Sequence, residues 1–271
     1  MFKFWKNVTD LRKTSATLSG GCYSRDYAYK NLPVAMTRRV CDNGLWIPEP
    51  VEVALGDDGA VVCRSKGAGA AFGENRETFE TSAGLFTSRN HGRFGGRLIT
   101  PKGRIYGNFV EVFECGGKIY AVDSHEGDGA THLKICKFNR GLKPVRIFES
   151  KGPQNRLLDE EIAFKALYLR DDRAYLLASG TVRRKTKNRP CEALPRSYLL
   201  EIRKGQIEEK AVFDQEFPLV NNMVIRNGKM FLGMDKTVAV ADLETGSVTA
   251  YTPLGVEAEF NILRTNCEKT A

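Results

Sequence analysis

Short apolar runs separated by polar turns recur along most of the chain. The segment 223–253 predicts four strands, at 223–225, 229–234, 237–243 and 247–253, and its two tight turns are at Asn227-Gly228 and Thr245-Gly246. Asn-Gly accepts positive φ at both central positions of a type I′ turn, which joins tight β-hairpins. The pattern therefore predicts an antiparallel sheet with one buried face, which needs a second sheet to cover it.

The same frame recurs upstream. It consists of an apolar strand, a polar turn, a long polar or small residue, and an apolar run ending in Ser or Asp. The copies are "VALGDDGAVVCRS" (53–65), "FECGGKIYAVDS" (113–124), "YLRDDRAYLLAS" (168–179) and "IRNGKMFLGMD" (225–235). The residues after the turns are Ala60, Lys118, Arg173 and Lys229, spaced 58, 55 and 56 apart. A second hairpin follows in each unit, so the sequence predicts four-stranded sheets repeated radially, as in a β-propeller.

On these residues, the sequence resembles the broad β-propeller class with Kelch-, WD- or quinoprotein-like repeats, over about residues 50–255. No Trp-Asp dipeptide or kelch Gly-Gly pair occurs at the expected place, so the resemblance stops at the class. It implies a single all-β domain, 1–271, of four-stranded antiparallel blades. Residues 50–255 would form four blades. The C-terminal strand within 256–271 and strands from the N-terminal segment 1–49 would complete a fifth blade.

The alternative is four blades with an N-terminal extension. The helical spacing of "RLLDEEIA" predicts a short helical turn at 156–163, the one helical element expected in this region. The predicted inter-sheet core comprises Ile119, Tyr120, Val122, Leu176, Leu177, Phe231, Leu232, Val238 and Val240.

Cysteine usage and hydropathy indicate a cytoplasmic protein. Seven cysteines, an odd number without a Cys-x-x-Cys pair, favour reduced thiols over a disulfide framework. Cys63, Cys115 and Cys136 fall in expected strands, where a free cysteine acts as a small apolar residue. No run approaches the ~20 apolar residues of a membrane span. The first 18 residues lack the apolar core of a secretory signal.

The charge is positive and unevenly distributed. The chain has 41 Lys and Arg against 33 Asp and Glu, a formal net charge of +8. Residues 81–110 contain five basic residues and no acidic one. Such a field favours acidic partners: nucleic acid, an acidic protein surface or a phosphorylated ligand. Ordinary solubility is the other interpretation.

Loop lengths in the repeat alignment suggest where a partner binds. The connection between the second and third strands is long in two units, at 66–96 and 180–196, and is 125–131 in another. Long loops on one face usually form a binding surface. The 180–196 loop contains Arg183, Arg184, Lys185, Lys187, Arg189 and Arg196 against Glu192. Its arginines can bind phosphates or carboxylates in bidentate fashion, while the alternative is a solvated loop.

Two other clusters need interpretation. Segment 87–98 has Arg89, His91 and Arg93 before Gly95-Gly96. It is either an anion-binding loop or a tight turn that Phe94 anchors to the core.

The second cluster, segment 123–132, offers Asp123, His125, Glu126, Asp128 and His132, which are metal-ligand types. Its histidine spacing matches no zinc motif, and the two rings can point apart, so we predict no metal and no cofactor.

Catalysis finds little support in the sequence. Five-bladed propellers include glycosidases, and the candidate carboxylates for that chemistry are Asp123, Asp128, Asp159, Glu160 and Glu161. Their pairing is not readable from spacing, so no catalytic residue is assigned.

We therefore predict a non-catalytic module that presents a basic loop face to an acidic protein partner, such as a bacterial immunity protein masking a toxin domain. Nucleic acid is the alternative partner. The basic segments lack regularly interleaved aromatic residues, although Phe86, Phe94 and Tyr106 lie near the second cluster.

Overall fold

The computed structural model describes residues 50–251 except 58, 68–76, 92–93, 127–130, 151–157, 187–188, 218 and 236. Every regular element in this part of the chain is a β-strand, so the all-β prediction is confirmed. The helical turn predicted at 156–163 is wrong, because residues 158–163 belong to a strand. Eight residues are too few to separate helical from strand periodicity, and pairing with the neighbouring strand decides the outcome. The strands expected at 20–49 and 256–271 lie outside the described residues.

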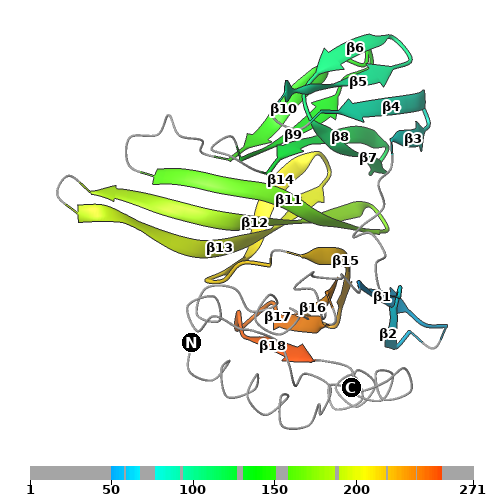
Figure 1. The fold of residues 1–271 in the computed structure, drawn as a ribbon. Helices are drawn as coiled ribbons and strands as arrows, with labels where there is room; N and C mark the ends of the chain where they lie inside the picture. The colour runs from blue at the N-terminus through cyan, green and yellow to red at the C-terminus, as the bar shows by residue number, and fades with distance from the viewer. Residues whose placement is uncertain are drawn as a thin grey trace. The chain divides into compact units, whose positions relative to one another are not determined.

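The strands form four four-stranded antiparallel sheets and one two-stranded sheet (Figure 1). The two-stranded sheet contains β1 (Val51–Leu55) and β2 (Val61–Ser65). The four-stranded sheets, in chain order, are β3 (Thr78–Thr81), β4 (Gly84–Asn90), β5 (Gly96–Thr100) and β6 (Gly103–Tyr106); β7 (Phe109–Cys115), β8 (Lys118–His125), β9 (His132–Phe138) and β10 (Pro144–Glu149); β11 (Leu158–Arg170), β12 (Arg173–Thr186), β13 (Arg189–Arg203) and β14 (Gln206–Phe213); and β15 (Val220–Arg226), β16 (Lys229–Met234), β17 (Val238–Asp242) and β18 (Val248–Tyr251). The prediction of repeated four-stranded antiparallel sheets is confirmed.

The prediction that the hairpins at 53–65 and 98–107 belong to one repeat unit is wrong. The hairpin of β1 and β2 forms a sheet of its own and does not join β5 and β6. The supposed 66–96 loop instead contains β3 and β4, whose turn at Ser82-Ala83 has no Gly or Asn to signal it. The hairpin turn of this sheet that lies before Gly84 is therefore the one to compare with the turn before Lys118. The turn before Ala60, used in the repeat alignment, belongs to a separate sheet.

The chain divides into two compact units, one of residues 74–216 and the other of residues 1–73 with 217–271. In the first unit, the β7–β10 sheet packs against a sheet on each face. One core joins it to the β3–β6 sheet through Phe86, Leu98 and Phe138. The other joins it to the β11–β14 sheet through Tyr120 and Leu176. Strand β8 is buried on both faces, which explains why its apolar run does not alternate with polar residues.

Two buried serines connect neighbouring sheets. Ser88, near the end of β4, donates its hydroxyl to the carbonyl of Phe109 at the start of β7. Ser124, near the end of β8, accepts a hydrogen bond of 2.9 Å from the backbone N–H of Phe164 in β11. Both serines are buried. Ser124, which ends one copy of the repeated frame, and Ser88 are thus satisfied by backbone groups of the next sheet, as buried hydroxyls require.

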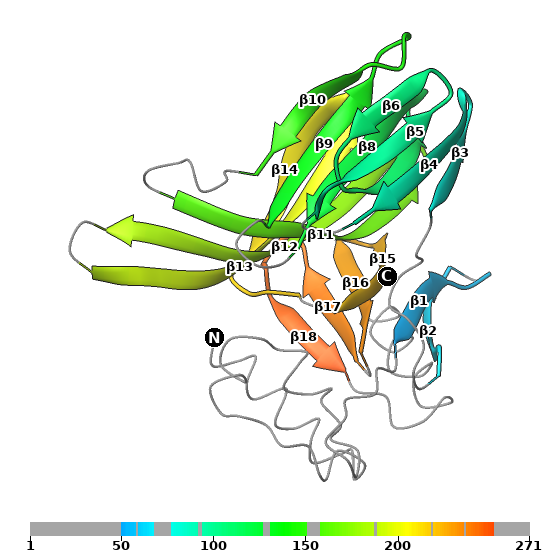
Figure 2. The ribbon, with the colours of Figure 1, turned by 45° about the horizontal axis from the view of Figure 1, so that its top comes forward.

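The β11–β14 sheet contains the longest strands of the described chain. Strands β11, β12 and β13 have 13, 14 and 15 residues, whereas β14 pairs with β13 only between Ser197 and Arg203. The first three strands therefore continue beyond the fourth as a three-stranded extension of residues 158–162 and 180–196, which we call the arm (Figure 2). The basic loop predicted at 180–196 is wrong, because residues 180–186 and 189–196 form the paired ends of β12 and β13.

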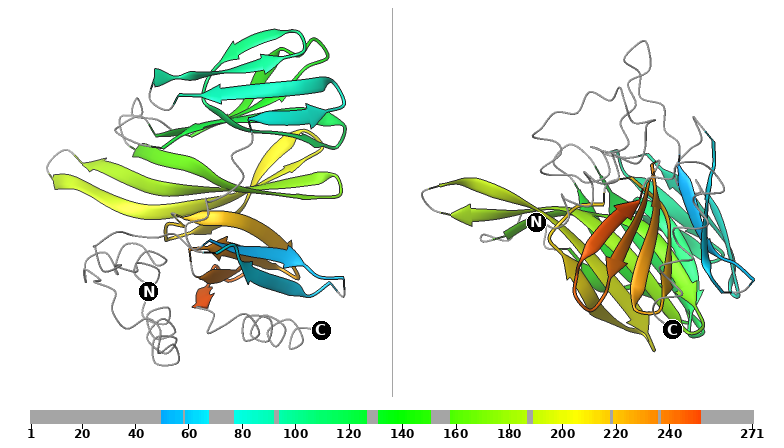
Figure 3. Two further views of the ribbon diagram at one scale, coloured as in Figure 1. Left: turned by 45° about the vertical axis from the view of Figure 1, so that its right-hand side comes forward. Right: turned by 90° about the horizontal axis from the view of Figure 1, so that it is seen from below.

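The second unit places the β1–β2 hairpin against β15. The side-chain amide of Asn222 accepts from the Val53 N–H at 2.9 Å and donates to the Val53 carbonyl at 2.7 Å, as a neighbouring peptide would. Asn227 and Gly228 have φ of 48° and 71°, so the predicted turn conformation between β15 and β16 is confirmed. Figure 3 shows the β1–β2 hairpin, in blue, beside the orange strands of the β15–β18 sheet. All nine predicted core residues are buried. Cys63, Cys115 and Cys136 are not joined in disulfide bonds, as expected.

Candidate functional site

The outer face of the β3–β6 sheet concentrates arginine. Arg89 of β4 lies directly opposite Arg97 of β5, which lies opposite Tyr106 of β6. Directly opposed residues point to the same side of a sheet. The neighbouring positions Ser88 and Leu98 are buried, so the row faces away from the core. Strands β4, β5 and β6 contain no acidic residue.

We call Arg89, Arg97, Arg104 and Tyr106 the arginine face. Arg104 is two residues from Tyr106 on β6 and therefore shares its side of the sheet. Opposed like charges destabilise a sheet, and the Arg97 Nε is buried without a hydrogen-bond partner among the described residues. An acidic group binding here would relieve both costs.

Two large aromatic side chains in this part of the β3–β6 sheet are largely exposed. Tyr106 is 85% exposed, and Phe94, in the turn between β4 and β5, is 81% exposed. They are the two most exposed large hydrophobic residues of the described chain, whereas Phe86 is fully buried. Of the three aromatic residues singled out from the sequence, Phe94 and Tyr106 can therefore contact a partner and Phe86 cannot.

The 91–96 turn has the tight geometry expected of its glycines. The His91 N–H donates to the Gly95 carbonyl at 3.0 Å, and Gly95 has φ of 81°, which favours glycine. A Cβ on Gly96 would lie 2.6 Å from the Arg89 carbonyl oxygen. The expectation that Phe94 anchors this turn is wrong, because its side chain is exposed. Arg89 and His91 are exposed, and Arg93 lies outside the described residues.

In the arm, pairing brings acidic residues beside the basic ones. Arg183 lies opposite Asp159 of β11, and Arg184 lies opposite Glu192 of β13. The six basic residues of the arm are accompanied by four acidic ones: Asp159, Glu160, Glu161 and Glu192. Counting along 180–196 included only Glu192, so the sequence overstated the positive charge of this region.

Strand register places three of the basic residues predicted to bind a partner in the arm. Backbone pairing is described for Arg183, Arg184 and Arg189, whose partners on β12 or β13 are Ala193, Glu192 and Thr186. Lys185 is the unpaired position at a register shift between Arg184 and Thr186, and Lys187 lies outside the described residues. Pro190 and Pro195 lie on β13, along an edge that β14 does not cover. Proline on such an edge discourages the addition of another strand.

The 123–132 segment brings its two histidines together. His125 and His132 are opposed across β8 and β9, with ring centroids 6.4 Å apart, so they do not point apart. The His132 Nε2 lies 3.1 Å from the Asp123 Oδ1, which also accepts the Asn108 N–H at 2.7 Å. Burial opposes ionisation of Asp123, but these hydrogen bonds, with the charges of His132 and Lys134, outweigh it and lower its pKa.

A buried lysine lies near the same strand ends. Lys165 occupies the bulge of β11 between Phe164 and Ala166, and its side chain is only 4% exposed. Its Nζ lies 2.7 and 2.6 Å from the two carboxylate oxygens of Glu126. Burial raises the pKa of Glu216. The positive charge of Lys165 acts to lower this pKa, and the negative charge of Glu126 acts to raise it. The sequence pattern pointed to Glu126 but not to Lys165 or Glu216, because a bulge has no clear signature in a single sequence.

These groups do not form a metal site in the part of the chain that the structure describes, where no three His, Cys, Asp or Glu residues are placed to hold an ion. Asp128 lies outside that part. Of the five carboxylates considered for glycoside hydrolysis, Asp123 is bound to His132 and the Asn108 N–H, and Asp159 lies in register with Arg183.

Comparison with known proteins assigns no family. No family model matches the sequence, and no curated protein matches it. Among solved structures, the chain is similar to the crystal structure of the computationally designed Ika8 protein, with a TM-score of 0.31 and 12% identity over 73% of this chain and 71% of that chain. Among the described residues, no helix has the length and apolar character needed to cross a membrane.

Proposed function

We propose that this protein is a non-catalytic binding module that contacts an acidic protein through the arginine face. The observation that supports the proposal is the row of Arg89, Arg97 and Tyr106 across three strands, without acidic residues on those strands. Arginine and tyrosine are enriched among the residues that dominate protein interfaces. Because both side chains combine apolar area with hydrogen-bonding groups, they suit a carboxylate-rich surface.

A rigid sheet makes this row suitable for recognition. Leu98 and Phe86 on the opposite side are fully buried, so the backbone beneath the arginines is held by the core. Preorganisation lowers the entropic cost of binding. A cytoplasmic immunity protein that masks an acidic toxin domain is the biological setting we propose for such a surface.

The proposal includes a β-propeller architecture. Four four-stranded antiparallel sheets support it, each corresponding to one blade, and the β1–β2 sheet would belong to a fifth. An experimental structure in which the sheets do not surround a common axis would contradict the propeller while leaving the arginine face to be tested separately.

Single-stranded nucleic acid is a second candidate partner, favoured by the exposed rings of Tyr106, on the arginine face, and of Phe94, in the turn between β4 and β5. Bases stack on such rings, and guanidinium groups bind the phosphates. Nucleic acid and acidic protein differ in salt dependence, because phosphate contacts give a steep loss of affinity with added salt. Apolar contacts in a protein interface persist when charges are screened.

The test is affinity capture from native lysate, with and without nuclease, read by mass spectrometry. The protein is compared with an Arg89→Glu/Arg97→Glu variant and with a control, Lys143→Glu/Arg203→Glu, that makes the same charge change at exposed positions elsewhere. We expect a stoichiometric protein that survives nuclease and the control substitutions but is lost with the arginine-face variant.

Co-purifying nucleic acid lost with the same variant would select the second candidate. A partner retained by the arginine-face variant would contradict both. Melting curves of the three proteins should agree closely, because Arg89→Glu/Arg97→Glu replaces one pair of like charges by another and the control changes only exposed charges.

A further inference from the structure

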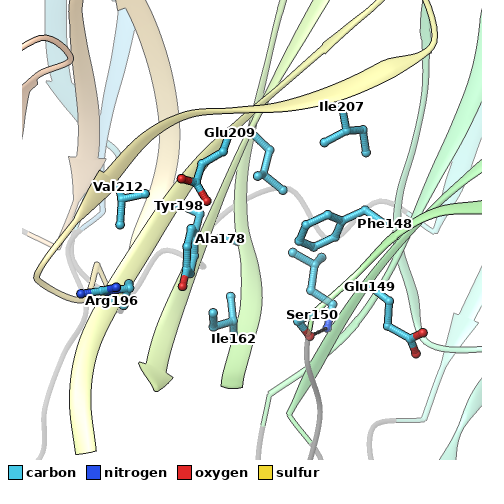
Figure 4. A pocket seen from close by; sticks show the side chains of 12 residues that line it. Phe148, Glu149, Ser150, Ile162, Ala178, Arg196, Tyr198, Ile207, Glu209 and Val212 are labelled. Carbon is cyan, nitrogen blue, oxygen red and sulfur yellow. Dashed lines mark hydrogen bonds between the residues drawn. The ribbon is translucent and has the colours of Figure 1, made fainter. Parts of the chain in front are cut away.

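A cavity of about 410 Å³ lies between the β7–β10 and β11–β14 sheets (Figure 4). Its apolar lining includes Leu133, Phe148, Ile162, Leu200, Ile207 and Val212. The volume is within the range of about 300–1,000 Å³ found for small-molecule sites, which are mostly apolar with a few polar groups. The two sheets share one core, so the cavity is an incompletely filled part of a packed interface.

Polar groups occur at both walls of the cavity. Arg196 and Tyr198 lie two residues apart on β13 and therefore share a face, and Ser150 follows β10 on the opposite wall. The Arg196 Nη2 donates to Asp214 at 2.7 Å, but its buried Nε has no hydrogen-bond partner among the described residues. A buried N–H of a charged group is costly when no acceptor meets it.

The lining also includes two carboxylates. Glu149 is held by Arg146 and by Lys134, whose Nζ lies 3.6 Å away. Glu209 lies opposite Leu200 and is exposed. Arg196 is thus the cation of the lining, and its guanidinium has N–H donors besides the one that binds Asp214.

We propose that this cavity binds a small amphipathic carboxylate whose apolar chain lies between the sheets and whose head group accepts from the Arg196 guanidinium. A charged acceptor suits this position best, because hydrogen bonds between ionised groups are about twice as strong as neutral ones. The ligand's chain replaces water along the apolar lining. This site is independent of the arginine face, which lies on the β3–β6 sheet.

Isothermal titration calorimetry of the full chain with decanoate, decanol and decylamine tests the proposal. The three probes share a chain and differ in the head group, and all are used below the concentrations at which they aggregate. Decanoate should bind more tightly than decanol by about tenfold or more. Arg196→Gln should reduce decanoate to the affinity of decanol, whereas Asp214→Asn, which removes only the outer partner of Arg196, should keep the preference.

The chain-binding part has its own variants. Ile207→Trp should fill the cavity and abolish binding of all three probes, while Leu169→Trp adds the same bulk at a 46% exposed position outside the lining and should leave binding unchanged. If Ile207→Trp fails to melt cooperatively, Val212→Phe replaces it. Binding of decanoate that survives cavity filling, no binding of any probe, or tighter binding of decylamine than decanoate would each overturn the proposal.

Discussion

The arginine face and the arm are both rich in arginine and lysine, but their structures surround those residues differently. In the arginine face, Arg89 and Arg97 meet across two strands that lack acidic residues. In the arm, Arg183 and Arg184 lie opposite Asp159 and Glu192. Charge counted along the chain made the arm the stronger candidate, while charge counted across the strands favours the arginine face.

The difference shows that the partner strands decide the electrostatic character of a sheet surface. Opposed charges stabilise a strand pair, and in the arm Arg183 and Arg184 each stand in register with one acidic residue. The opposed pair of Arg89 and Arg97 does not stabilise the β3–β6 sheet, because like charges repel each other. Residues that are unfavourable for folding and exposed in a regular row are better candidates for binding a partner.

The largest expected effects come from the cores beneath the two regions. Leu98→Ala, below the arginine face, and Leu177→Ala, in the sheet that carries the arm, should each lower the free energy of unfolding by about 2–5 kcal/mol, because both side chains are fully buried. Leu85→Ala is the matched control, since Leu85 is 53% exposed on the arginine-face sheet. Denaturant melts measure all three. Similar melts for Leu98→Ala and Leu85→Ala would mean that the β4–β5 register is wrong.

The next effect concerns the start of the arm. A Cβ at Gly180 would lie 2.0 Å from the Glu161 carbonyl oxygen, a backbone atom that cannot turn aside. Gly180→Ala should therefore cost about 1–3 kcal/mol by forcing β11 and β12 apart. Gly141→Ala, where the new carbon meets only the Asn139 side chain at 3.3 Å, is the control. Equal stabilities in urea melts would show that the strands do not approach so closely.

A smaller effect is expected from reversing charge in the arm. The Arg183→Glu/Arg184→Glu variant sets each new carboxylate opposite Asp159 or Glu192. Like charges directly opposed should lower stability by about 0.2–1 kcal/mol per pair, seen as a slightly reduced Tm that recovers in high salt. Partner affinity should fall less than with Arg89→Glu/Arg97→Glu. A larger loss of affinity from the arm variant would indicate that the arm, and not the arginine face, is the main contact surface.

The smallest expected effects are on the pH dependence of stability, through one carboxyl group near each region. Asp123, on the face of β8 that packs toward the β3–β6 sheet, has a lowered pKa. Its contribution to stability is therefore present above its unfolded pKa near 4 and is lost as pH falls further. Glu216, after the β11–β14 sheet, has a raised pKa, so its contribution is present in acid and is lost as pH rises through the folded pKa.

Two neutral variants check these signs. Asp123→Asn should reduce the Tm at pH 7 and have less effect at pH 3. Glu216→Gln should raise the Tm at pH 7 relative to the unmodified chain, with the advantage disappearing in acid. Thermal melts across this range measure both. Parallel curves for a variant and the unmodified chain would show that the carboxyl concerned titrates alike in the folded and unfolded states.

Local patterns in the sequence determined the strand content, several turns and the core. Asn227-Gly228 specifies its hairpin because only certain residues adopt positive φ, and buried residues such as Tyr120 and Leu177 follow from apolar runs between turns. Segment 87–98 also contained much of the candidate site. These features depend on residues close together in the chain.

Only the tertiary structure decided which strands share a sheet and which charges become neighbours. Neither Ser82 nor Ala83 is a Gly or Asn that would indicate a turn, so the sequence predicted a loop where β3 and β4 form a hairpin. It also predicted a loop in the arm, because long strands with basic residues lack a clear hydrophobic period. The pairing of Arg183 with Asp159 and the row from Arg89 to Tyr106 each bring together residues from different strands. The burial of the Arg196 Nε without a hydrogen-bond partner among the described residues likewise depends on the packing around it. Strand register and sheet packing create such contacts, and the free energies that select them are sums over the whole fold.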